Sequence, residues 1–287
     1  MTTPAAATAL VLAGGGVAGI AWELGVLRGL ADADPALADR VLAADLVVGT
    51  SAGSSVAAQV TSGVPLDELY EAQLRPETAE IEVDVDLPAL VEQINAAMAG
   101  AEGPEDAGRR IGALALAART TDPAARLAAI AARVPVPTWP ERRLLVTAVD
   151  ARSGALAVLT RDSGVALVDA VAASCAVPGV WPPVDLAGRP HVDGGVRSMA
   201  NSDLAAGADR VLVLLPALEG APALWGSSLD AEIAALAPSA VHVVHADQAS
   251  VDAFGTNALS PATRAASARA GRAVGAAQAA AVAALWS

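Results

Sequence analysis

The sequence predicts an α/β fold with a mainly parallel central sheet flanked by helices. Short apolar runs typical of buried strands alternate with segments of helical periodicity over the first third of the chain. Similar runs return after about residue 140, beyond a middle segment that contains few of them. We therefore expect a single domain over residues 1–287, with a helical insertion at about 63–140.

The first third predicts two strand and helix pairs. Residues 10–12 form a short apolar strand that runs into glycines. Apolar residues at helical spacing follow over about 20–31, and Asp34 with Pro35 ends that helix. Residues 46–48 form the next strand, and a helix of small residues follows it. This order of elements favours parallel pairing of the two strands.

The insertion predicts helices over 87–98, 106–119 and 122–133, and prolines close it near residue 140. Before the first of these helices, acidic and apolar residues alternate over 80–87, which predicts an exposed strand with one acidic face. A divalent-metal site on that face is an alternative, but solvated charges are the favoured interpretation.

The last part of the chain returns to strands and ends in a helix. The expected strands cover residues 144–149, 156–159, 211–215 and 241–244. The alanine-rich segment 273–286 is expected to be a packed C-terminal helix, because glycine and glutamine interrupt it and it lacks the apolarity of a membrane span.

Composition and charge narrow the classes of partner. The formal net charge is −13 at pH 7, which argues against nucleic acid because binding to phosphates relies on Lys and Arg. Cys175 is the single cysteine, so no intrachain disulfide can form, and we expect it to be buried for packing. Residues 1–13 lack the basic region of a signal peptide, so a cytoplasmic location is expected.

The strongest local motif is Gly49-Thr50-Ser51-Ala52-Gly53, which lies between an expected strand and an expected helix. A serine on such a sharp turn exposes its hydroxyl as a nucleophile, and the helix N-terminus favours developing negative charge. The competing interpretation is a serine that caps the helix between two turn glycines.

A second motif, Gly14-Gly15-Gly16-Val17-Ala18-Gly19, lies between the first strand and the first helix. Backbone N–H groups in such a loop can converge on a phosphate or on the oxyanion of acyl transfer. The loop also satisfies the dinucleotide pattern G-x-G-x-x-G, although the acidic residue expected after the second strand is missing. A purely structural glycine turn is the third interpretation.

The third motif is Asp193-Gly194-Gly195, which follows an extended, proline-containing segment. Alone, an Asp-Gly pair is typical of a turn. Together with the other two motifs, it completes a set of nucleophile, base and oxyanion loop.

These motifs, in this order, resemble the patatin-like phospholipase family, and residues 173–183 resemble the segment that leads to the family's aspartate. The resemblance covers both ends of the expected core but not the helical middle. It implies a serine lipid acyl hydrolase with Ser51 as nucleophile, Asp193 as base and Gly14, Gly15 and Gly16 as the oxyanion loop. The supporting motif glycines are Gly49, Gly53, Gly194 and Gly195.

The same resemblance implies a lipid or another hydrophobic ester as substrate and requires no cofactor or metal. Ala18 departs from the family pattern, which often has Arg or Lys there, so a charge contact with substrate at that point is in doubt. A transient membrane contact of the insertion and the oligomeric state are left open.

Three other functions compete with this one. An ordinary α/β-hydrolase would use Ser51 and Asp193 with His242 or His245, but these histidines lie in a strand-like run that favours structural roles. A nucleotide-binding protein would use Gly14 to Gly19. A non-catalytic interaction protein would retain the motif residues without arranging them in an accessible catalytic site.

Overall fold

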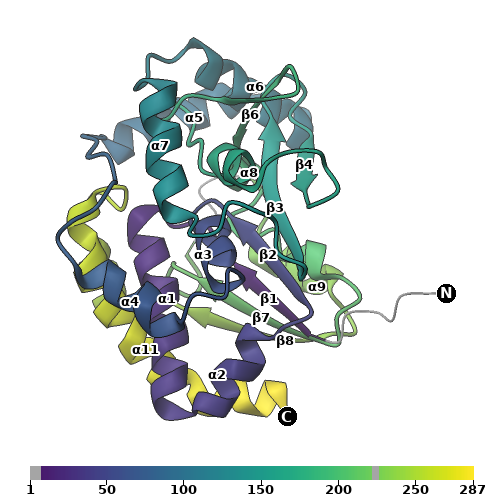
Figure 1. The fold of residues 1–287 in the computed structure, drawn as a ribbon. Coiled ribbons are helices and arrows are strands. Elements are labelled where there is room, and N and C mark those ends of the chain that lie inside the picture. The colour runs from purple at the N-terminus through teal and green to yellow at the C-terminus, as the bar shows by residue number, and fades with distance from the viewer. Residues whose placement is uncertain (1–7, 222–225) are drawn as a thin grey trace.

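A computed structural model describes residues 8–221 and 226–287, which form one eight-stranded sheet with helices on both faces (Figure 1). The strands are β1 (Thr8–Leu12), β2 (Leu46–Thr50), β3 (Arg143–Asp150), β4 (Leu156–Leu159), β5 (Val184–Leu186), β6 (Arg189–Asp193), β7 (Arg210–Leu215) and β8 (Ala240–His245). The helices are α1 (Gly16–Ala33), α2 (Pro35–Leu42), α3 (Ala52–Val60), α4 (Leu66–Leu74), α5 (Leu87–Met98), α6 (Pro104–Ala117), α7 (Pro123–Arg133), α8 (Leu167–Ser174), α9 (Leu229–Ala235), α10 (Gln248–Phe254) and α11 (Arg264–Trp286).

The sheet is mostly parallel, as predicted. Its strand order is β5-β6-β3-β2-β1-β7-β8, and β4 pairs with β3 beside this path. Strands β3, β2, β1, β7 and β8 are parallel, whereas β4, β5 and β6 join antiparallel. The pairing of β6 with β3 brings the end of β6 beside the end of β2, where the sequence places Asp193 and Ser51.

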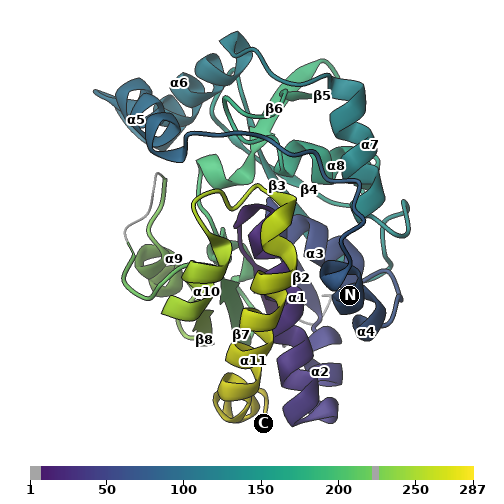
Figure 2. The same cartoon turned by 90° about the vertical axis from the view of Figure 1, so that its left-hand side faces the viewer.

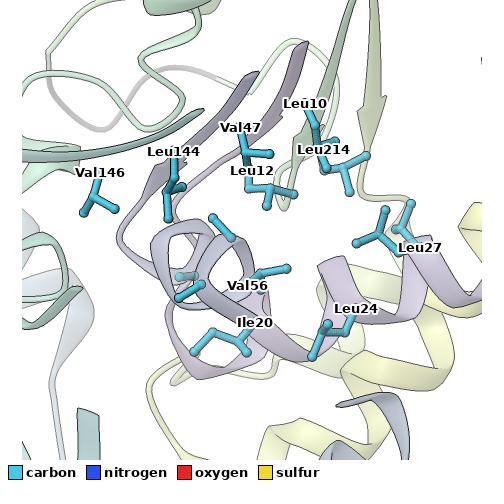
Figure 3. Packing of buried hydrophobic residues seen from close by; sticks show 14 of the residues in the cluster. Leu10, Leu12, Ile20, Leu24, Leu27, Val47, Val56, Leu144, Val146 and Leu214 are labelled. Carbon is cyan, nitrogen blue, oxygen red and sulfur yellow. The ribbon is translucent and has the colours of Figure 1, made fainter. Parts of the chain in front are cut away.

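The main core lies between the sheet and helices α1 and α3. Successive residues of a strand point to opposite faces, so Leu10 and Leu12 of β1 pack toward these helices, whereas Ala9 and Val11 join the cluster on the other face. Figure 3 shows Ile20, Leu24 and Leu27 of α1, with Val56 of α3, packing beneath the strands. The helical periodicity in the sequence therefore marks the buried face of α1.

The first and last long helices, α1 and α11, lie side by side along most of their length (Figure 2). Glycines allow their backbones to come close: a Cβ on Gly275 would lie 2.0 Å from the Val26 carbonyl oxygen, and one on Gly25 would lie 2.2 Å from that of Ala268. Helix α11 begins at Arg264, nine residues before the expected start at residue 273. No helix in the described part of the chain is long and apolar enough to cross a membrane.

The acidic segment before α5 is not the exposed strand that the alternating sequence predicts. Residues 77–86 are irregular and cross the molecule as a long connection between α4 and α5 (Figure 2). The side chain of Asn257 donates to the Val83 carbonyl at 2.7 Å, so the segment is held by side chains and has no strand partner. Glu80 is not solvated either, because it forms a largely buried ion pair with Arg133 of α7.

Candidate active site

Ser51 lies at the turn between β2 and α3 in a backbone conformation that residues with side chains rarely adopt. Its φ and ψ are 51° and −116°, and such outliers cost about 1–3 kcal/mol unless the surroundings hold them. The Ser51 N–H donates to Ser174 Oγ at 2.9 Å, and the Ser51 carbonyl accepts from Ser54 Oγ at 2.6 Å and Cys175 Sγ at 3.2 Å. The strained turn is therefore fixed by the end of α8.

The serine turn and the glycine loop are joined directly. The Gly53 N–H donates to the Ala13 carbonyl at 2.9 Å. A Cβ on Gly53 would lie 2.0 Å from the Leu12 carbonyl oxygen, so no side chain fits there. The small residues of the motif thus allow the N-terminus of α3 to pack against the end of β1, which brings the N-termini of α1 and α3 to the same site.

Asp193 ends β6 and lies in direct contact with Ser51. Ser51 Oγ donates to Asp193 Oδ2 at 2.6 Å, and the Gly195 N–H donates to Oδ1 at 2.7 Å. Both side chains are buried. Burial raises the pKa of Asp193 to about 7, although hydrogen bonds from Ser51 and Gly195 and the charge of Arg126 act to lower it. The structure therefore pairs a hydroxyl with a carboxylate that can exchange a proton near neutral pH.

A polar network beside the site connects β2 and β3 with the loop that follows Asp193. Thr50 and Thr147 share a hydrogen bond of 2.8 Å between their hydroxyls, and Asn201 Nδ2 donates to Thr50 Oγ1 at 3.1 Å and to the Ser198 carbonyl at 2.7 Å. Arg197 donates to Asn201 Oδ1 at 2.8 Å. This network fixes the loop after Asp193 against β2 and β3.

The glycine loop divides into bonded and free donors. The Gly14 N–H donates to the Met199 carbonyl at 2.8 Å, so it is occupied. The backbone N–H groups of Gly15, Gly16 and Ala52 have no acceptor among residues 8–221 and 226–287. Gly16 and Ala52 also line a small cavity together with Ser51. Free donors thus remain at the N-termini of α1 and α3, where helix dipoles favour an anion.

The cavity beside Ser51 is small, with a volume of about 10 Å³, which is room for about one water molecule. Arg126 and Arg133 of α7, together with Trp181, form part of its wall. Helix α7 lies within residues 63–140, the segment expected to be an insertion, so this segment contributes directly to the site.

The two histidines of the alternative triad lie elsewhere. His242 and His245 belong to β8, which is separated from β2 by β1 and β7. At about 4.8 Å per strand, that is roughly 14 Å. His242 Nε2 pairs with Gln278 Oε1 of α11 at 3.1 Å. Neither histidine forms a hydrogen bond with Ser51 or Asp193, and this geometry argues against the Ser-Asp-His arrangement.

Sequence reasoning missed several residues that shape the site. Ser174 and Cys175 hold the Ser51 turn, and Cys175 therefore does more than the packing expected of it. Arg126 and Arg133 lie seven residues apart, two turns along one helix face, beside the buried Ala129 and Ile130. Basic residues on the apolar face of a predicted helix are the signal that could have indicated them.

Solved structures include distant likenesses to this chain. It is similar to VipD from Legionella pneumophila, with 13% identity over 88% of this chain and 54% of that one and a TM-score of 0.39. It is also similar to the type III effector protein ExoU, with 14% identity over 98% of this chain and 54% of that one and a TM-score of 0.43. The chain therefore spans about half the length of each.

No curated protein sequence matches the chain. The profile of the family described as patatin-like phospholipase, however, matches residues 10–206. This range begins in β1, contains the glycine loop, Ser51 and Asp193, and ends before β7. Because the match extends over more than half of the sequence, the chain belongs to the patatin-like phospholipase family.

Proposed function

We propose that the chain is a serine acyl hydrolase that cleaves ester bonds of lipids, of the phospholipase or lysophospholipase type, through a covalent intermediate on Ser51. The observation that carries the proposal is the 2.6 Å hydrogen bond from Ser51 Oγ to the buried Asp193 carboxylate. A nucleophile and a base within hydrogen-bond reach are the minimum that covalent acyl transfer requires. Membership of the patatin-like family supports the choice of lipid esters.

In the first half of the reaction, Asp193 Oδ2 takes the proton of Ser51 as Oγ attacks the ester carbonyl carbon. The negative oxygen that forms is held by the free backbone N–H groups of Gly15, Gly16 and Ala52. Gly16 and Ala52 are among the residues that line the cavity. The bond to the leaving alcohol then breaks, and the alcohol oxygen takes the proton from Asp193. The acyl group remains bonded to Ser51.

In the second half, water gives a proton to Asp193 and attacks the acyl carbon. The bond to Ser51 Oγ breaks, Oγ regains the proton, and the fatty acid leaves. We assign Gly14 to the shape of the loop, because its N–H is already bonded to Met199.

Covalent labelling tests the proposal. A fluorophosphonate probe is expected to label the wild-type protein at Ser51, and Ser51→Ala is expected to lose both the label and the hydrolysis of p-nitrophenyl esters and phospholipids. Ser55→Ala, one helical turn further along α3, serves as the matched control and should keep the label. Full esterase activity in a folded Ser51→Ala protein would contradict the mechanism, and saturable nucleotide binding without labelling would favour the dinucleotide interpretation of the glycine loop.

The pH dependence of turnover provides an independent prediction. Asp193 must be ionised to accept the Ser51 proton, and burial raises its pKa to about 7. With an uncharged p-nitrophenyl ester, kcat/KM is therefore expected to rise with pH through about 7 and then reach a plateau. An acidic limb near pH 4, the range of an ordinary aspartate, would contradict the role of the buried carboxylate.

A further inference from the structure

Helix α7 directs two buried arginines at the cavity, and they differ in their partners. Arg133 forms two hydrogen bonds with Glu80, at 2.7 and 2.6 Å, so its charge is neutralised. Arg126 is only 6% exposed, its guanidinium donates no hydrogen bond within the described ranges of the chain, and its Nη1 is buried. One positive charge beside Ser51 therefore lacks a direct partner.

Trp181 holds the Arg126 side chain in position. The guanidinium carbon of Arg126 lies 3.8 Å from the centre of the Trp181 ring. Stacking of this kind uses the face of the guanidinium and leaves its N–H donors, which lie in the plane, available to an acceptor. The stacking on Trp181 therefore orients the N–H groups of Arg126 without providing them with a hydrogen-bond acceptor.

Asp193 is not a hydrogen-bond partner of the Arg126 guanidinium. Its two carboxylate oxygens accept from Ser51 and Gly195, and no hydrogen bond joins it to Arg126. Burial lowers the pKa of Arg126 to about 10, so the group stays charged near neutral pH. Because an unpaired buried charge is costly, the site is suited to a ligand that brings a negative charge of its own.

We propose that Arg126 forms an anion subsite beside Ser51, which binds the phosphate of a phospholipid while the acyl ester lies at Ser51 Oγ. The inference rests on the proposed hydrolase function and adds a residue that selects the substrate. Since the cavity holds about one water molecule, the side chains that line it must move apart when the lipid enters.

The test compares a lipid that carries a phosphate head group with one that carries none. Phosphatidylglycerol and diacylglycerol with identical acyl chains are presented in the same uncharged detergent micelles, and the ratio of their kcat/KM values is measured. Arg126→Met and Arg126→Gln are expected to lower this ratio by about ten- to a hundredfold, the effect of losing a charge-assisted hydrogen bond. Arg126→Lys should restore part of it. Arg119→Met, an exposed position in the same insertion, is the control and should keep the wild-type ratio.

The rate of fluorophosphonate labelling shows that the site of each variant is folded. A labelled Arg126 variant that keeps the wild-type ratio would overturn the anion subsite and leave the hydrolase function standing. This holds both when hydrolysis of the two lipids falls equally and when neither rate falls. If the wild-type protein neither labels nor hydrolyses any ester, the proposed function fails, and the subsite fails with it.

Discussion

Replacing Asp193 by asparagine is expected to lower kcat/KM by about 10² to 10⁴-fold, the usual contribution of a general base. An amide occupies the same space beside Ser51 but cannot take the proton from Oγ. The measurement is ester hydrolysis at pH 8, with Asp162→Asn as a control at an exposed aspartate.

The same substitution is expected to stabilise the protein at pH 8. The Asp193 carboxyl ionises near pH 3.8 in the unfolded chain and only near pH 7 in the fold. Between these values the folded state holds the extra proton, so the stability of the wild type falls as pH rises through this window, by about 4 kcal/mol at most. Because asparagine does not ionise, the Asp193→Asn variant does not lose stability in this way as pH rises.

Urea unfolding at pH 4 and pH 8 measures the second effect. From pH 4 to pH 8, the free energy of unfolding of the variant should increase relative to that of the wild type. A variant that is inactive and equally destabilised at both pH values would indicate a structural role for Asp193 and would remove the argument for a base.

Replacing Glu80 by glutamine is expected to destabilise the fold by about 3–5 kcal/mol, because Arg133 would remain charged and buried without its partner. Although burial acts to raise the pKa of Glu80, the Arg133 charge and hydrogen bonds hold it below its usual value. The stabilisation from this ionised pair should therefore be present above pH 4.5 and be lost as pH falls further.

Asp84→Asn is the matched control, because Asp84 is an exposed acid in the same segment and its loss should change the free energy of unfolding by about 0.5 kcal/mol or less. Combining Glu80→Gln with Arg133→Met should recover part of the loss, since the charge of Arg133 that lost its partner is then removed as well. Equal unfolding midpoints for Glu80→Gln and Asp84→Asn in urea would contradict the buried ion pair.

The parts of this protein that could be predicted from the sequence are those encoded by short segments. The strands next to Gly14 and Gly49 have local apolar runs, and the turn glycines follow them directly. The parallel sheet and its order of strand, turn and helix therefore followed from the pattern. Residues 184–193 contain few apolar residues and a proline, so the antiparallel β5 and β6 gave no comparable signal.

Contacts between distant segments could not be predicted in this way. The alternation around Glu80 has the period of a strand. However, Glu80 pairs with Arg133, and the Val83 carbonyl accepts from the Asn257 side chain instead of from a neighbouring strand. Arg126 likewise belongs to an amphipathic helix, and the pattern of that helix does not reveal which cavity the Arg126 side chain lines. Pairing and burial of charges depend on tertiary packing, which the pattern of one segment does not contain.

The close packing of α1 against α11 has a consequence for how the chain folds during translation. Helix α1, which carries the glycine loop at its start, is synthesised well before its glycine-lined partner α11. Contacts between segments so far apart form late. During translation the face of α1 that contains Gly25 therefore stays exposed to chaperones or to wrong partners until α11 docks on it.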